Sequence, residues 1–82
     1  MSHIPHELKE EFPADAETIR HLASENPQFA ALTKRYDIVN AEIHRIEGGE
    51  DAASDTRWEE LKKERLHLKD SIFAQLVHLR NA

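Results

Sequence analysis

The segment LKKERLHLKD, residues 61–70, is the most informative about the fold because it lies in the longest helical pattern without proline or glycine. At about 100° per residue, this pattern carries two apolar stripes on different faces of one helix. The first stripe comprises Trp58, Leu61, Leu68, Ile72, Leu76 and Leu79, interrupted by Arg65. The second stripe comprises Leu66, Phe73 and Val77. One facing helix covers the first stripe, and the second requires a third element or another chain.

A second helix, predicted over residues 27–47, offers the matching surface. Its apolar residues alternate in steps of three and four, a spacing typical of coiled-coil seams: Phe29, Leu32, Tyr36, Val39, Ile43 and Ile46. Asn26 is a favourable N-cap before Pro27, and Gly48-Gly49 favours a helix end. The short connection to a helix over residues 55–79 predicts an antiparallel hairpin, because a short loop makes its two helices neighbours.

The N-terminal part of the chain is predicted less firmly. Pro13 suits the first turn of a shorter helix over residues 13–25, whose phase leaves open whether it folds back or extends the next helix. Residues 1–12 are weakly specified, with a short turn or helix over residues 6–12. The predicted fold is therefore all-α: an antiparallel, coiled-coil-like helical hairpin with a shorter N-terminal helix, in one domain over residues 13–80.

The composition of the chain argues against several classes of function: enzymes with deep pockets, nucleic-acid binding and membrane association. Charged residues make up 33% of the chain and aromatic residues 6%, a profile of a solvated helical protein rather than an enzyme with a deep pocket. The net charge of −5 provides no bulk attraction for nucleic acid or anionic membranes. The absence of cysteine is typical of a reducing compartment, and no apolar run approaches the ~20 residues of a membrane span. Without a signal-peptide pattern at the start, we expect a cytoplasmic protein with no membrane partner.

Three segments resemble one known family. These are Glu11-Phe12-Pro13, the run from Asn40 to Glu47, and the pattern LKKxRLxLKD. Together with the hairpin seam they resemble the YdcH family of small bacterial proteins over most of residues 6–76. The resemblance implies a helical hairpin in a short cytoplasmic bacterial protein of unknown function, and it implies no catalytic residues.

Catalytic and metal-binding chemistry has little support in the sequence. A histidine metal site needs several converging ligands, and the predicted hairpin brings together at most two histidines, His21 and His78 at its open end. His3 and His6 are close only in sequence, near the start of the chain, and the six histidines are His3, His6, His21, His44, His67 and His78. No phosphate-binding loop, nucleophile elbow or serine–histidine–acid arrangement is recognisable. We therefore expect no enzyme activity, no cofactor and no metal.

The basic run of the last helix is a candidate for binding. Lys62, Lys63, Arg65 and Lys69 are suited either to RNA phosphates or to an acidic protein surface. Alternatively, the lysines flank the seam and cover it with their aliphatic stems. Arg65 occupies a seam position and needs a partner for its charge, and Asp37 is the nearest acid in the predicted register. Asp37 and Arg65 therefore form a candidate structural pair, with contact to a partner's carboxylate or phosphate as the alternative for Arg65.

The second stripe, Leu66, Phe73 and Val77, is the best lead to function. In one interpretation the N-terminal helix folds back and covers it with Phe12, Ile19 and Leu22. In the other, the stripe is an interchain seam for self-association or for an amphipathic helix of another protein. The sequence favours a non-enzymatic protein-interaction or adaptor module that self-associates. The alternative function is a small RNA- or ribosome-associated regulator that uses the basic run.

Overall fold

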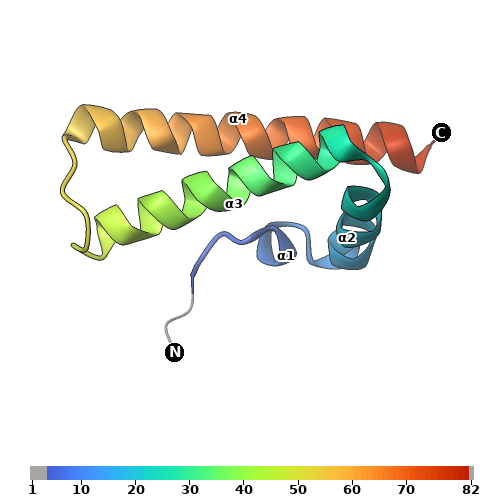
Figure 1. Cartoon of the computed structure of the whole chain (residues 1–82), viewed down its shortest axis with the longest axis horizontal. Coiled ribbons are helices and arrows are strands. Elements are labelled where there is room, and N and C mark those ends of the chain that lie inside the picture. The colour runs from blue at the N-terminus through green and yellow to red at the C-terminus, as the bar shows by residue number, and fades with distance from the viewer. Residues whose placement is uncertain (1–3, 82) are drawn as a thin grey trace.

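The computed structural model describes residues 4–81, so His3 lies outside the described part. The elements are α1 (Leu8–Glu11), a 3-10 turn η1 (Pro13–Asp15), α2 (Ala16–Glu25), α3 (Pro27–Glu47) and α4 (Asp55–Arg80). The long helices α3 and α4 lie antiparallel, α2 lies below the end of the hairpin where α3 begins, and α1 lies below its middle (Figure 1). The predicted all-α helical hairpin is confirmed.

Local signals set the helix ends. The Asn26 side chain accepts a hydrogen bond from the backbone N–H of Phe29 at 2.9 Å, as expected of an N-cap. Ser54 caps α4 in the same way, accepting from the N–H of Arg57 at 3.1 Å. After α3, Gly49 adopts the left-handed conformation with φ 78°, which glycine tolerates better than other residues.

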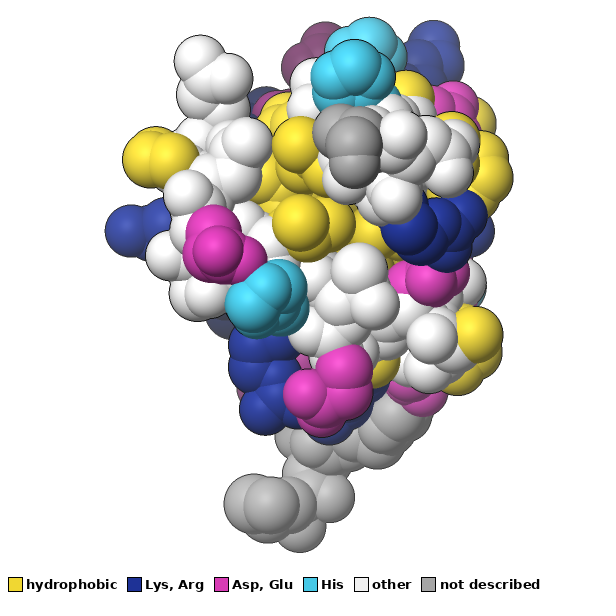
Figure 2. All heavy atoms as spheres, turned by 90° about the vertical axis from the view of Figure 1, so that its right-hand side faces the viewer, with side chains coloured by type: hydrophobic (Ala, Val, Ile, Leu, Met, Phe, Trp, Pro, Cys, Tyr) yellow, Lys and Arg dark blue, Asp and Glu magenta, His cyan; other side chains and the backbone are white. Residues whose placement is uncertain are grey.

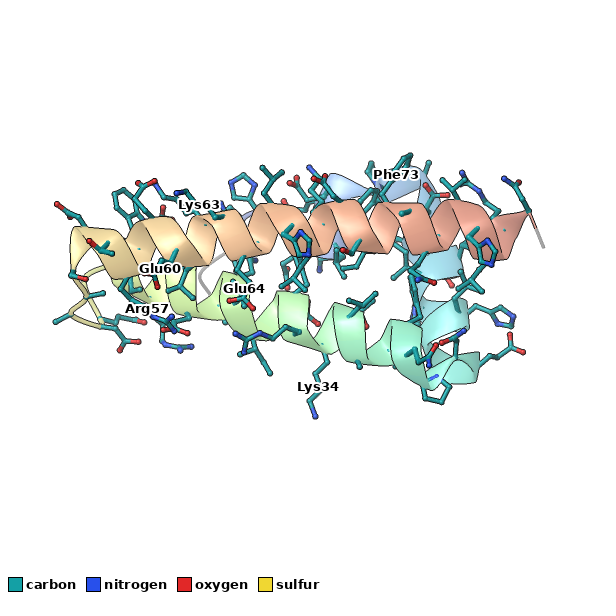
Figure 3. The ribbon with its side chains drawn as sticks, turned by 90° about the horizontal axis from the view of Figure 1, so that it is seen from above. Lys34, Arg57, Glu60, Lys63, Glu64 and Phe73 are labelled. Carbon is teal, nitrogen blue, oxygen red and sulfur yellow. The ribbon has the colours of Figure 1, made fainter. Side chains whose placement is uncertain are left out.

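The core is the seam between the two long helices. Four residues of α3 and four of α4 are buried there: Phe29, Tyr36, Val39, Ile43, Leu61, Leu68, Ile72 and Leu76. Two ion pairs also join the helices, one between Arg35 and Glu64 at 2.8 Å and one between Arg57 and Glu42 at 3.2 Å. Arg57 and Glu64 lie over the line where α3 and α4 meet (Figure 3). Apolar burial thus fixes the pairing, and charged pairs border it.

The N-terminal elements fold back against the hairpin. The chain turns at Asn26, α2 packs against α3, and Ile19 joins the buried core. Leu8 of α1 is also buried. The sequence predicts residues 1–12 only weakly. In the structure, the described part of this segment, residues 4–12, packs against the hairpin. At the open end of the hairpin, hydrophobic side chains reach the surface among charged and histidine side chains (Figure 2).

Candidate functional site

The second apolar stripe of α4 remains largely open. Leu66 is 60% exposed and Phe73 50% exposed, whereas Val77 is half-buried. Phe73 and Lys63 both point away from α3, along the outer edge of α4 (Figure 3). We call the surface formed by Leu66, Phe73 and Val77 the α4 edge.

The cover on the α4 edge comes from Phe12, at the end of α1. The Phe12 and Phe73 rings stack with their centroids 6.1 Å apart and their planes 7° from parallel. The other two residues expected to cover the stripe, Ile19 and Leu22, pack instead with the hairpin core. The fold-back interpretation is therefore right about the path of the chain, but Leu66 and Phe73 remain largely exposed despite the contact with Phe12.

The basic run is mostly engaged within the chain. The Lys62 ammonium lies 2.8 Å from a Glu59 carboxylate oxygen and 3.6 Å from the centroid of the Trp58 ring. The Lys69 ammonium donates to Glu11 at 3.0 Å. Lys63 is exposed on the outer edge of α4 (Figure 3). The run therefore presents less free positive charge than its sequence indicates.

The expected pairing of Asp37 with Arg65 is wrong. The Arg65 guanidinium donates to the side-chain oxygen of Asn40 at 3.0 Å. Asp37 instead lines a hollow of about 260 Å³ together with Glu7, Ile19 and Arg20. Loss of surrounding water, and then the nearby Glu7 carboxylate, raise the pKa of Asp37. Arg65 thus donates to the neutral amide of Asn40. Asp37, the predicted partner of Arg65, lies near the Glu7 carboxylate instead.

Two buried polar side chains of α3 hold the N-terminal segment. Asn40 donates to the carbonyl of Pro5 at 2.9 Å, and the Tyr36 hydroxyl donates to the carbonyl of His6. Burial, more than any nearby charge, raises the pKa of Tyr36 to about 12, so the hydroxyl keeps its proton at neutral pH. Sequence reasoning placed Tyr36 on the seam but did not assign hydrogen bonds to Tyr36 or Asn40. The available signal was that buried polar groups must find partners.

Charged contacts complete the attachment of this segment to α4. A hydrogen bond from Lys69, with smaller help from His6, lowers the pKa of Glu11. Farther along, Arg80 donates to Asp15 at 2.7 Å. Beside α4, the Lys69–Glu11 contact borders a hollow of about 170 Å³ lined by His6, Glu11, Tyr36, Lys62, Arg65, Leu66 and Lys69. Within residues 4–81, no three histidine, cysteine or acidic side chains are grouped to hold a metal.

Comparison with known proteins relates the helical hairpin to a protein family. A family model described as "Protein of unknown function (DUF465)" matches residues 29–76, from the first buried residue of α3 to the last buried residue of α4. The chain belongs to this family. The DUF465 match thus covers the hairpin core, and α1 and α2 lie before it.

Curated relatives agree with the DUF465 assignment. The Escherichia coli K12 protein "Uncharacterized protein YdcH" is 33% identical over 61 residues, covering 74% of this chain and 82% of that protein. The Shigella flexneri protein of the same description matches to the same extent. No solved structure matches the chain. In the described part of this DUF465 protein, the helices are too short or too polar to cross a membrane.

Proposed function

We propose that this DUF465 protein is a non-enzymatic interaction module that binds another polypeptide through the α4 edge. The observation that carries the proposal is the exposure of Leu66 and Phe73, at 60% and 50%, on a helix whose first apolar stripe is buried. Full burial of such a side chain contributes about 1.5–3 kcal/mol. A polypeptide that covers both residues therefore gains a substantial part of its binding energy there.

The hollows of the molecule support binding rather than catalysis. Those beside α1 enclose about 260 and 170 Å³ and are open to solvent. Sites for small molecules usually enclose about 300–1,000 Å³ and bury most of the ligand. The carboxylates Glu11, Glu59 and Glu64 each pair with a cation, and such pairing lowers their pKa values. A general acid at neutral pH needs a raised pKa, and among the four carboxylates of residues 4–81 with a resolved shift only that of Asp37 moves in this direction.

The alternative function, binding of RNA by the basic run, is the weaker proposal. Lys62 and Lys69 already contact carboxylates and aromatic rings, and Arg65 donates to Asn40. The carboxylates beside Lys62 and Lys69 partly neutralise the positive charge that would attract phosphates. The net charge of −5 adds no long-range attraction.

Site-specific photo-crosslinking tests the proposal. A photoreactive residue replaces Leu66, and in a control chain it replaces Lys34, which points away from the hairpin on α3 (Figure 3). Irradiation of bacterial cells that express each chain should give protein adducts from position 66 and not from position 34. Nuclease treatment should leave the adducts unchanged. The same adducts from both positions, or none from position 66, would overturn the proposal, and adducts that nuclease removes would favour RNA.

A further inference from the structure

We infer that the polypeptide bound by the α4 edge is a second copy of this chain, with the two α4 helices antiparallel about a two-fold axis between Lys69 and Asp70. The inference rests on the proposed function of the α4 edge as a binding surface. It goes further because it names the occupant, the direction and the residue pairing.

The inferred antiparallel pairing is based on the pattern of residues along the outer side of α4. Four residues on this side are spaced seven positions apart: Glu59, Leu66, Phe73 and Arg80. At about 100° per residue, such positions drift by only about 20° per step, so they form one nearly straight row. The row has an acid at one end, a base at the other and two large apolar residues between them.

This row is complementary to itself only when reversed. Around the point between Lys69 and Asp70, Leu66 faces Phe73 of the second copy, and Glu59 faces Arg80 of the second copy. At the centre, each Lys69 faces an Asp70. A two-fold axis produces every such contact twice, which is how closed dimers are built. The reversed arrangement thus matches apolar with apolar side chains and opposite charges with each other.

The parallel arrangement is disfavoured by the same residues. In a parallel, in-register pair each position faces its own copy, so Glu59 faces Glu59 and Arg80 faces Arg80. Facing like charges oppose association and exclude wrong arrangements. The charges at the ends of the row therefore select the antiparallel direction.

The residues of the row are available for contact. Glu59, Leu66, Phe73 and Arg80 of the row are exposed, as is Asp70 beside it, whereas Lys69 is half-buried. Within the chain Glu59 already pairs with Lys62, and Phe12 stacks on one face of Phe73. Arg80 already donates to Asp15, and Lys69 to Glu11. A guanidinium has five N–H groups and an ammonium three, so each cation retains donors for a second carboxylate. Intrachain contacts hold these two side chains near α4 without consuming them.

The size of the row predicts a weak dimer. α4 is about 39 Å long at 1.5 Å per residue, but only two large apolar side chains on it are strongly exposed. A stable interface buries about 800 Å² on each partner, and smaller ones are usually transient. We therefore expect a monomer–dimer equilibrium that depends on protein concentration.

Charge reversal with complementation tests the pairing. Sedimentation equilibrium is measured from about 10 µM to about 1 mM for the wild type, Glu59→Arg, Arg80→Glu and an equimolar mixture of the two variants. Each variant alone places like charges opposite each other twice, and its dimer should be weaker by about tenfold or more. In the mixture both opposite-charge pairs are restored. The heterodimer should therefore form with an affinity within about threefold of the wild type.

Two matched controls separate the pairing from general effects. Glu60→Arg makes the same charge change one position away, on the side of α4 that faces α3 (Figure 3), and should leave dimerisation unchanged. Asp15→Ala removes the intrachain partner of Arg80 but keeps the row, and should also dimerise as the wild type does. Circular dichroism confirms that each variant keeps its helix content.

Several results would overturn the inference. They are a monomeric wild type over the whole range, a mixture that stays as weak as its components, or a Glu60→Arg variant as weak as Glu59→Arg. A monomeric wild type whose position 66 still crosslinks to a different protein would overturn the second copy as occupant and leave the proposed function intact. The absence of any crosslink from position 66 would instead remove the proposed function.

Discussion

Asn40 makes two side-chain hydrogen bonds between α3 and other parts of the chain. Its amide nitrogen donates to the carbonyl of Pro5, and its amide oxygen accepts from Arg65. One side chain therefore connects the N-terminal segment, α3 and α4. An amide suits this position because it can donate and accept at once, whereas a carboxylate can only accept.

A double-mutant cycle should detect this connection. Asn40→Ala combined with Arg65→Ala should show a coupling of about 1 kcal/mol in urea unfolding, since a hydrogen bond to a charged group lies between them. Asp37→Ala combined with Arg65→Ala is the control and should be additive within about 0.5 kcal/mol. A larger coupling of Arg65 with Asp37 than with Asn40 would contradict the observed contact.

Asp37 should respond to pH in the opposite direction from Glu11, Glu59 and Glu64, whose pKa values are lowered. Its folded-state pKa is raised by loss of water and by Glu7, so its ionisation destabilises the fold above the ordinary Asp pKa of 3.8. Asp37→Asn should therefore stabilise the protein against urea at neutral pH. The gain should shrink as pH falls through the raised folded pKa and vanish below 3.8, where both states are protonated.

The matched control for this substitution is Asp70→Asn on the exposed outer side of α4, measured at about 1 µM, where the proposed dimer is dissociated. It makes the same chemical change without the neighbouring Glu7, so no comparable stabilisation is expected. A destabilising effect of Asp37→Asn at neutral pH would contradict the assigned direction of the pKa shift.

Among the elements, the N-terminal segment matters more than its short α1 helix indicates. It contributes the buried Leu8, the Phe12 ring on Phe73 and the carbonyls bonded by Tyr36 and Asn40. A four-residue helix has no stability of its own, because most helical stability in proteins comes from tertiary packing. The hairpin therefore holds the segment in place, and the segment completes the hairpin core.

Removal of residues 1–12 should destabilise the hairpin. Leu8 contributes about 1.5–3 kcal/mol by burial, and each lost hydrogen bond about 0.5–1.5 kcal/mol. With Leu8 and the two hydrogen bonds lost, we expect a decrease of about 2.5–6 kcal/mol in the free energy of urea unfolding, with helix content retained in α3 and α4. Tyr36→Phe, which removes only the hydroxyl contact, is the comparison and should cost about 0.5–1.5 kcal/mol. An unchanged midpoint after truncation would show that the segment adds nothing.

At the scale of the whole molecule, charge is divided between parts that the fold brings together. Residues 4–26 carry six acidic and two basic side chains, whereas α4 carries six basic and five acidic ones. The contacts Lys69–Glu11 and Arg80–Asp15 join these two regions. The acidic N-terminal part thus neutralises a share of the basic run of α4.

Acid should therefore loosen the whole assembly. Cations lower the folded-state pKa of Glu11 and of Glu64, through Lys69 and Arg35 respectively. Their stabilisation is complete above the ordinary Glu pKa of 4.5 and is lost as pH falls through the lowered folded values. Stability should decline with acid over this window. The pair of substitutions Glu11→Gln and Glu64→Gln should flatten the decline, and an equally steep profile in that variant would assign the acid response to other groups.

The hairpin could be predicted from the sequence because its determinants are periodic and local. The three-and-four spacing of the α3 and α4 seams requires two helical faces that meet, and Asn26-Pro27 and Gly48-Gly49 mark where the chain turns. The same periodicity separated Leu66 and Phe73 from the core, and both are exposed in the structure.

The path of the N-terminal segment and the partner of Arg65 depend on contacts between distant parts of the chain and could not be predicted from local patterns. The acceptors for Tyr36 and Asn40 are the backbone carbonyls of His6 and Pro5, respectively. Every residue has a backbone carbonyl, so such contacts leave no pattern in the sequence. The predicted register of the two helices aligns Asp37 with Arg65, and on this basis Asp37 is the expected ion-pair partner. In the folded chain Arg65 donates to Asn40 instead. The choice depended on which groups the folded-back segment covers, and that is set by packing among distant parts of the chain.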